Sequence, residues 1–330
     1  MTEEATEAPL IVALGEAMIR LTTRSRTSLS RAVELDVEVA GTELDLLIAA
    51  NALGARSRWL SRLPDNELGT MIRRHVASFD IEVRAITEPA GRAGLFFMEF
   101  GVPPRPSTVL YDRRDSAASH LCVEDFDWRD ELVDAKAAHT SGVTCALGDG
   151  PLEAVLAFFR AAKDLGVVTS FDMNYRSQLW DLDQARVAFQ QVLPFVDVLF
   201  LAPSDLETLT GLDDETEVLA NKVREEYDVT TMVLRDRREV STDELGAIVR
   251  VVGDDSSEVF AFGKVVDEIG AGDVAAGAFL AAMLGGEGNV VAAQRCARAY
   301  ARMLTIPGDT WSGSLHDLTD GYVTSRKVIR

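Results

Sequence analysis

The sequence predicts an α/β protein with a doubly wound, mostly parallel sheet and helices on both faces. From about residue 139 onward, short apolar runs alternate with helical segments, the pattern of parallel strands joined by helices. Leu10–Leu14 is a continuous apolar run ending at Gly15, as expected for a strand buried on both faces. We expect one domain over residues 1–330, because no internal repeat or long linker divides the chain.

Two segments, at about residues 17–41 and 91–115, do not follow this rhythm. In the first, apolar residues from Val33 to Val39 alternate with acidic ones, which is typical of a strand with one exposed face. In the second, residues 94–100 and 108–113 flank a proline-rich turn and predict a hairpin. We expect these two antiparallel pieces to fold together as a small second sheet, inserted twice into the main domain. It would serve as a lid, a dimerisation surface or both.

The other elements are placed by apolar spacing and by turn residues such as Gly54 and Pro64. Further strands are predicted at 57–63, 80–87, 139–143, 167–172, 196–201, 230–235, 245–251 and 257–263. Helices are predicted at 42–53, 67–79, 151–165, 183–193, 203–210, 215–226, 271–285 and 288–304.

Composition restricts the partners of the chain. The formal charge of −20 argues against nucleic acid and against an anionic membrane. No apolar run reaches the length of a membrane span, and residues 1–8 are acidic, unlike the start of a signal peptide. The 3 cysteines lack metal-like spacing. We therefore expect a cytoplasmic protein. Its acid excess with few lysines is compatible with a high-salt cytoplasm or with a genome that favours arginine codons.

The turn Gly270-Ala271-Gly272-Asp273 lies between a strand end and an alanine-rich helix. The first N–H groups of a helix lack partners within it, and with the helix dipole they suit an anion such as phosphate. A carboxylate in this first turn would repel phosphate. The residue types leave two interpretations of Asp273 open. It caps the helix, or it takes a proton from a hydroxyl that attacks the phosphorus.

Four loops, one of which contains this turn, are expected to meet at one cleft, because ligands of open parallel sheets bind at the carboxyl ends of the strands. These loops lie at residues 15–20, 172–176, 202–205 and 267–273. The inserted sheet would cover the cleft between them. Closure of such a lid excludes water, which a phosphoryl transfer requires if it is not to become hydrolysis.

Seven stretches resemble the ribokinase-like (PfkB) carbohydrate kinases, and within that family the 2-keto-3-deoxygluconate kinases. They follow one another in order over about residues 10–310. The resemblance implies the ribokinase-like fold and a phosphate transfer from ATP, with Mg²⁺, to a hydroxyl of a sugar or sugar acid. The stretches are Gly15–Leu21, Leu60–Gly69, Arg105–Arg113, Ser141–Thr144, Asp172–Arg176, Asp267–Asp273 and Thr305–Asp309.

The resemblance also implies roles for single residues. Asp273 matches the catalytic base, and Arg176 matches an arginine that contacts both sugar and phosphate. The anion hole matches Gly270, Ala271 and Gly272. Sugar-binding positions match Gly41, Thr42, Asp45, Phe97, Tyr111, Arg113, Arg176, Asp273 and Asp309. Nucleotide-side positions match Asn174, Tyr175, Arg235, Gly270 and Gly272. Asp205 matches a position that organises Mg²⁺ through water, and Asp267 one near a monovalent cation such as K⁺.

The sugar-binding positions depart from the family pattern. Asp45 stands where an asparagine is usual, and an ionised aspartate only accepts hydrogen bonds. This carboxylate would repel a sugar acid unless Arg113 or Arg176 intervenes. Phe96 and Phe97 stand where a tyrosine hydroxyl is expected.

Three functions therefore remain open. The first is a kinase for 2-keto-3-deoxygluconate or a related sugar or sugar acid. The second is a kinase for a neutral sugar such as fructose, or for a nucleoside. The third is a weakened kinase fold that only binds its ligands, which the replacement of a metal-organising asparagine by Ala202 would favour. In each case we expect a homodimer formed through the lid, since an exposed sheet edge readily pairs with its twin.

Overall fold

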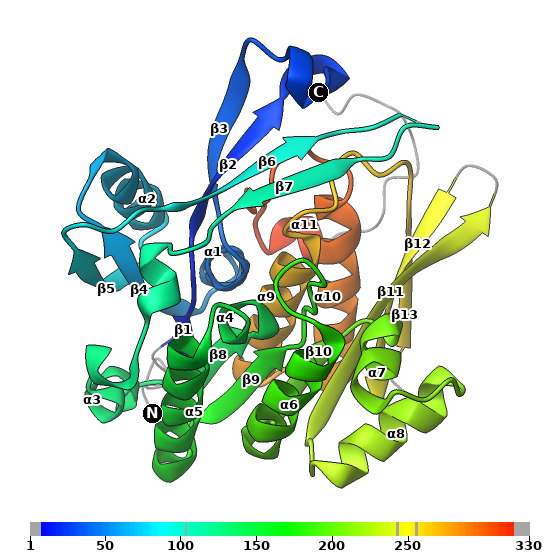
Figure 1. The fold of residues 1–330 in the computed structure, drawn as a ribbon. Helices are drawn as coiled ribbons and strands as arrows, with labels where there is room; N and C mark the ends of the chain where they lie inside the picture. The colour runs from blue at the N-terminus through cyan, green and yellow to red at the C-terminus, as the bar shows by residue number, and fades with distance from the viewer. Residues whose placement is uncertain (1–7, 103, 242–243, 255–256, 320–330) are drawn as a thin grey trace, which may run out of the picture.

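The computed structural model describes residues 8–102, 104–241, 244–254 and 257–319 (Figure 1). Within these ranges the main sheet has nine strands. In spatial order they are β13 (Ser257–Phe262), β12 (Glu244–Val252), β11 (Thr231–Ser241), β10 (Val198–Leu201), β9 (Val168–Asp172), β8 (Ala137–Ser141), β1 (Leu10–Leu14), β4 (Arg56–Pro64) and β5 (Glu82–Glu88). All neighbours from β11 to β5 are parallel, whereas β12 and β13 continue the sheet antiparallel at one edge.

Helices cover both faces of the main sheet, as predicted (Figure 1). One face carries α1 (Thr42–Ala52), α2 (Glu67–Ala77), α9 (Ala271–Leu284) and α10 (Asn289–Met303). The other carries α3 (Trp128–Leu132), α5 (Asp149–Leu165), α6 (Leu182–Val192), α7 (Pro203–Thr210) and α8 (Thr216–Glu226). The buried strand β1 joins both cores, because Ile11 and Ala13 pack on the first face while Leu10, Val12 and Leu14 pack on the second.

The two segments that interrupt the α/β rhythm form one four-stranded sheet, as predicted. Its order is β3 (Leu35–Ala40), β2 (Met18–Thr23), β6 (Gly94–Glu99) and β7 (Thr108–Asp112). Strands β2 and β6 pair in parallel. Each segment supplies its own antiparallel pair, and the parallel contact joins the two. The sheet lies above the carboxyl ends of the main strands (Figure 1).

Some element boundaries differ from the prediction. Strand β8 lies two residues earlier than expected, because Ser141 caps the short helix α4 (Gly142–Cys145) by accepting a hydrogen bond from the Val143 N–H. Strand β11 continues to Ser241, since its exposed second half pairs with β12. Helix α11 spans His316–Thr319. Short 3-10 helices span Arg24–Arg26, Leu29–Arg31, Ala117–His120, Val123–Asp125 and Leu193–Phe195. In the part of the chain that is described, no helix is long and apolar enough to cross a membrane.

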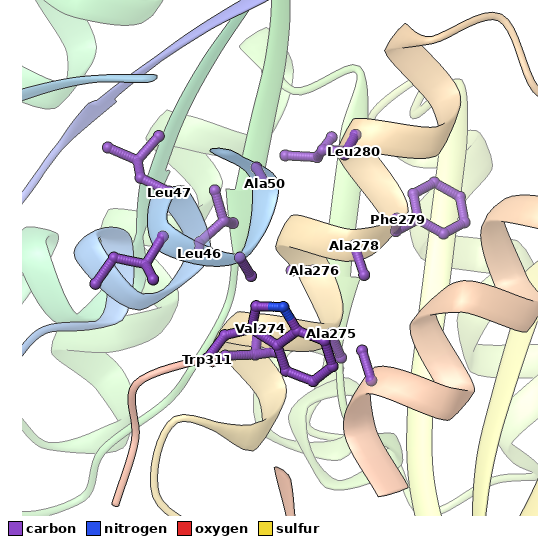
Figure 2. Packing of buried hydrophobic residues seen from close by; sticks show 14 of the residues in the cluster. Leu46, Leu47, Ala50, Val274, Ala275, Ala276, Ala278, Phe279, Leu280 and Trp311 are labelled. Atoms are coloured by element: carbon purple, nitrogen blue, oxygen red, sulfur yellow. The ribbon is translucent and has the colours of Figure 1, made fainter. Parts of the chain in front are cut away.

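Helices α1 and α9 pack closely against each other (Figure 2). Figure 2 shows Leu46, Leu47 and Ala50 of α1 beside the small side chains of α9. The closest approach is at Gly277, where an added Cβ would lie 2.3 Å from the Leu46 carbonyl oxygen. The Leu46 carbonyl is a backbone group and cannot rotate away as a side chain can, so any residue larger than glycine at position 277 would clash with it.

Gly277→Ala is therefore expected to lower the free energy of unfolding by about 2 kcal/mol, despite the better helix propensity of alanine. The matched control is Gly263→Ala, whose added methyl group meets nothing within 4 Å. Urea denaturation of both variants measures the difference. Unchanged or increased stability of Gly277→Ala would show that the two helices can separate without cost.

Candidate active site

The turn before α9 has the geometry of an anion-binding site. Gly270 is the N-cap residue and adopts a left-handed conformation with φ of 74°. An added Cβ there would lie 2.5 Å from the Cβ of Asp309, so both the angle and the space require glycine. No side chain caps the helix start at Gly270. The N-cap residue thus leaves the first N–H groups of α9 without a side-chain acceptor, and Gly270, Gly272 and Asp273 line the cavity beside them.

Asp273 is not the helix cap, because Gly270 occupies that position. Its carboxylate Oδ1 accepts a hydrogen bond of 3.3 Å from Asn174 Nδ2. The pKa of Asp273 is raised to about 8, chiefly by burial and also by the nearby Asp172 carboxylate, while Arg176 and Arg235 act in the opposite direction. A carboxylate with this pKa can hold a proton near neutral pH, which suits a general base.

Two cavities meet at Asp273. The first, of about 250 Å³, lies over the carboxyl ends of β9, β10 and β11. The second, of about 60 Å³, lies beneath the four-stranded sheet and beside the start of α1. Asp273, Gly270 and Arg176 line both cavities, so a group in one cavity can react with a group in the other across this junction.

The cavity beneath the sheet brings together most of the predicted sugar-binding residues. The correction concerns Phe97. Tyr111 pairs with Phe96 across β6 and β7, and alternate residues of a strand face opposite sides, so Phe96 lines the cavity and Phe97 lies on the outer face. The predicted residues that line the cavity are Gly41, Thr42, Asp45, Tyr111, Arg113, Arg176, Asp273 and Asp309.

Two carboxylates in this cavity are almost completely buried. Asp45 Oδ2 accepts a hydrogen bond of 3.3 Å from the Gly41 N–H, while its Oδ1 has no partner among the described residues. Neither oxygen of Asp309 has a hydrogen-bond partner in that part of the chain. Burial raises the pKa of Asp309 to about 7. Burial also raises the pKa of Asp45 well above its usual value, and the nearby Asp309 and Asp273 add to the effect.

Sequence reasoning missed Arg20, which joins the four-stranded sheet to the loop before α9. Its guanidinium forms an ion pair with Asp267 and lies 3.5 Å from Asp309 Oδ2. Asp267 also accepts hydrogen bonds of 3.0 Å from the N–H groups of Ile269 and Gly308. A monovalent cation at Asp267 would therefore have to share this carboxylate with Arg20. The sequence signal that could have indicated this role was the charge of Arg20 within a strand whose other residues are mostly apolar.

Two further buried carboxylates were also missed. Glu16 pairs with Arg113 and accepts a hydrogen bond of 2.5 Å from Ser116 Oγ. Glu43 accepts hydrogen bonds of 2.6 Å from Ser141 Oγ and 2.8 Å from Thr144 Oγ1, and burial raises its pKa to about 7. Both carboxylates lie behind the cavity wall.

The larger cavity holds the predicted nucleotide-side residues. Its lining includes Asn174, Tyr175, Arg176, Asp205 and Arg235. Asp205 Oδ2 accepts a hydrogen bond of 2.8 Å from the Ala202 N–H at the start of α7, and burial raises the pKa of Asp205 to about 6. The described residues contain no group of three or more His, Cys, Asp or Glu side chains that could hold a metal ion.

A buried carboxylate at the junction of two cavities, beside free helix N–H groups, defines the class of enzyme that moves a phosphoryl group onto an alcohol. Residues 8–306 match the family described as pfkB family carbohydrate kinase. The chain belongs to this family.

Individual relatives agree with the family assignment. The chain is 34% identical to a 2-dehydro-3-deoxygalactonokinase of Haloferax volcanii, over 91% of this chain and 92% of the relative. It is also 34% identical to a 2-dehydro-3-deoxygluconokinase of Thermoproteus tenax, over 93% and 92%. The crystal structure of a 2-dehydro-3-deoxygluconokinase from Thermotoga maritima superposes with a TM-score of 0.87 at 29% identity, covering 94% of this chain and 97% of the other. The chain is thus a carbohydrate kinase with the ribokinase-like fold.

Proposed function

We propose that the protein transfers the γ-phosphate of ATP to a hydroxyl of 2-keto-3-deoxygluconate or a related sugar or sugar acid. The observation that carries this proposal is the position of Asp273 at the junction of the two cavities. The sugar occupies the small cavity beneath the four-stranded sheet, which serves as a lid. The triphosphate occupies the larger cavity. We place the reaction in the cytoplasm, where ATP is available.

The chemistry follows from the groups at the junction. Asp273 accepts the proton of the sugar hydroxyl as its oxygen attacks the γ-phosphorus. The N–H groups at the start of α9 and the Arg176 guanidinium stabilise the negative charge of the transferred phosphoryl group. Mg²⁺, which arrives with ATP, supplies further charge neutralisation. Asp205 is a carboxylate of the larger cavity that could hold it through water.

The substrate class rests on the named relatives and on the charges of the small cavity. Arg113 and Arg176 can bind a sugar carboxylate. Asp45 Oδ1 and the Asp309 oxygens, which have no hydrogen-bond partner among the described residues, suit the hydroxyl groups of the substrate. A neutral sugar is the second candidate, because the same two carboxylates disfavour an acid.

The test is an ADP-release screen over sugar acids, neutral sugars and nucleosides in the presence of Mg²⁺. Turnover greatest with 2-keto-3-deoxygluconate or its galactonate epimer supports the first candidate. Turnover greatest with fructose supports the second. Binding of ATP without turnover on any acceptor would overturn the proposal and favour a protein that only binds its ligands.

The raised pKa of Asp273 predicts the pH dependence of the reaction. Because the base must be ionised, kcat/KM should fall as the pH drops below about 8, the pKa of Asp273 in the free enzyme. Initial rates at subsaturating sugar, measured from pH 6 to pH 9.5 at constant ionic strength, test this expectation. A profile that is flat across this range would show that Asp273 does not act as a base with this pKa.

We propose that the homodimer forms through the outer face of the lid. Val37, Leu21, Phe97 and Leu110 pair side by side across its four strands, and Val37 and Leu110 are exposed. Packing of this apolar row against the same row of a second protomer would remove the outer face of the lid from water.

Leu110→Glu is expected to convert the dimer to a monomer at micromolar concentration, because each protomer would then bury a charge in the apolar row. Light scattering coupled to gel filtration measures the mass. Val218→Glu, on the exposed side of α8, is the control and should leave the mass unchanged. A wild-type monomer, or a Leu110→Glu dimer, would exclude this interface.

A further inference from the structure

Arg235 lies beneath the anion-binding turn and is almost completely buried. Its Nη1 donates a hydrogen bond of 2.5 Å to the Gly272 carbonyl oxygen, and its Nη2 donates one of 2.6 Å to Asp172 Oδ2. The guanidinium also lies over the ring of Phe200, with Cζ 5.3 Å from the ring centroid. Groups on α9 and β9 thus hold the two terminal nitrogens of this side chain, and a ring on β10 packs against its face.

We propose that Arg235 is a positioning residue for the phosphoryl transfer and not a nucleotide ligand, because it braces the anion-binding turn through the Gly272 carbonyl and fixes a positive charge beside Asp273. The inference rests on the proposed function of this site. It replaces the expectation, drawn from resemblance, that Arg235 contacts the nucleotide.

The geometric part of the inference follows from the planarity of the peptide bond. The Gly272 carbonyl and the Asp273 N–H belong to one peptide plane and point in opposite directions. An arginine that holds the carbonyl from beneath therefore directs the N–H toward the cavity. Gly272 has no side chain that could stiffen this peptide, and a Cβ added there would come within 3.4 Å of Arg235 Nη1. The brace adds a side-chain contact to the peptide at the start of α9.

The electrostatic part follows from the groups around Asp273. Asp172 on β9, Glu43 and Asp45 on α1, Arg176 in the loop after β9 and Arg235 on β11 are the charged groups that act on it. Arg235 lowers the pKa of Asp273, and Asp172 raises it. The two partners of one ion pair thus have opposite effects on the base, which gives the inference a signature that loss of packing would not produce.

The experiment compares Arg235→Gln, Arg235→Lys and Asp172→Asn with the wild type, with kcat, the KM for ATP and the pH profile as readouts. Arg235→Gln should lower kcat by about 100-fold with a change of less than about threefold in the KM for ATP. It should also move the acid limb to higher pH. Asp172→Asn should move the acid limb to lower pH.

Arg235→Lys separates charge from geometry. One ammonium group retains the charge but cannot fork onto two acceptors. The acid limb should stay near that of the wild type, while kcat stays about 10-fold below it. The control is Arg238→Gln, an exposed position on the same strand, which should match the wild type throughout. Thermal melting confirms that each variant is folded. If Arg235→Gln does not fold, the expected 10-fold loss of kcat in Arg235→Lys tests the inference instead.

Two results would overturn the inference. One is a rise of tenfold or more in the KM for ATP with kcat unchanged, which would mark Arg235 as a nucleotide ligand. The other is an acid limb that moves in the same direction in Arg235→Gln and Asp172→Asn. If the wild type itself shows no turnover, the proposed function fails separately. In that case, NMR titration of carboxyl-¹³C-labelled aspartate measures the pKa of Asp273 directly, with its signal assigned from Asp273→Asn. The pKa should rise in Arg235→Gln and fall in Asp172→Asn.

Discussion

Asp273→Asn is expected to lower kcat by roughly 1,000-fold while leaving the fold intact. Asparagine keeps the shape of the side chain, but its amide cannot accept the proton of the attacking hydroxyl. Burial disfavours the ionised form of Asp273, so a neutral amide should be tolerated well. The measurement is ADP release under saturating ATP and sugar, with thermal melting as the check on folding.

The control for this variant is Asp213→Asn, which removes a carboxylate from an exposed loop and should keep full activity. The sugar should still bind to Asp273→Asn, because the walls of the small cavity are unchanged. Isothermal calorimetry with sugar alone tests this point. Turnover at more than about a tenth of the wild-type rate would refute the role of Asp273 as the base.

Asp45→Asn is expected to lower the KM for a sugar acid by about tenfold, equivalent to about 1.4 kcal/mol of binding free energy. Asp45 lies buried near Asp309 and Asp273, so its ionised form adds to the negative charge that a sugar carboxylate meets. Asparagine removes this charge and adds a hydrogen-bond donor. The KM for a neutral sugar, measured alongside, should change less. An unchanged or higher KM for the sugar acid would show that charge repulsion by Asp45 does not control substrate choice.

The same variant should change stability in a pH-dependent way. The pKa of Asp45 is higher in the folded chain than in the unfolded chain, so its contribution to stability is full at acidic pH and is lost as the pH rises. Asp45→Asn should therefore melt at a higher temperature than the wild type at pH 8, and the gap should narrow toward pH 4. A difference in melting temperature that grows toward acidic pH would show that the pKa of Asp45 is not raised in the folded chain.

The sequence was sufficient to predict the features that depend on local patterns. The apolar run Leu10–Leu14 is the central strand β1, and the alanine-rich stretch after Gly270 is the buried helix α9. The two segments outside the α/β rhythm do form one separate sheet. Periodicity and turn residues act over a few positions, and these elements are specified at that range.

Contacts between distant parts of the chain were not predictable in this way. Arg20 and Asp267 are separated by 247 positions, and Ser141 and Glu43 by 98, so no local pattern links them. The prediction that Phe97 lines the sugar cavity was off by one residue, because Phe96 lines it instead. Either of two adjacent phenylalanines can face the cavity until the pairing of the strand is known. The contact between Arg235 and the Gly272 carbonyl, 37 positions apart, has no local signal either.

The way the four-stranded sheet is assembled has a consequence for protein engineering. Its two halves come from chain segments that flank α1, β4, α2 and β5. The parallel pairing of β2 with β6 unites them, together with hydrogen bonds from the Leu29 N–H to Glu99 and from Arg105 to the Arg26 carbonyl oxygen. Strand β3 leads directly into the turn at Gly41, which lines the small cavity. A chimaera that imports the substrate preference of a relative must therefore replace both segments together with this turn. Exchange of either segment alone would mismatch the seam between β2 and β6.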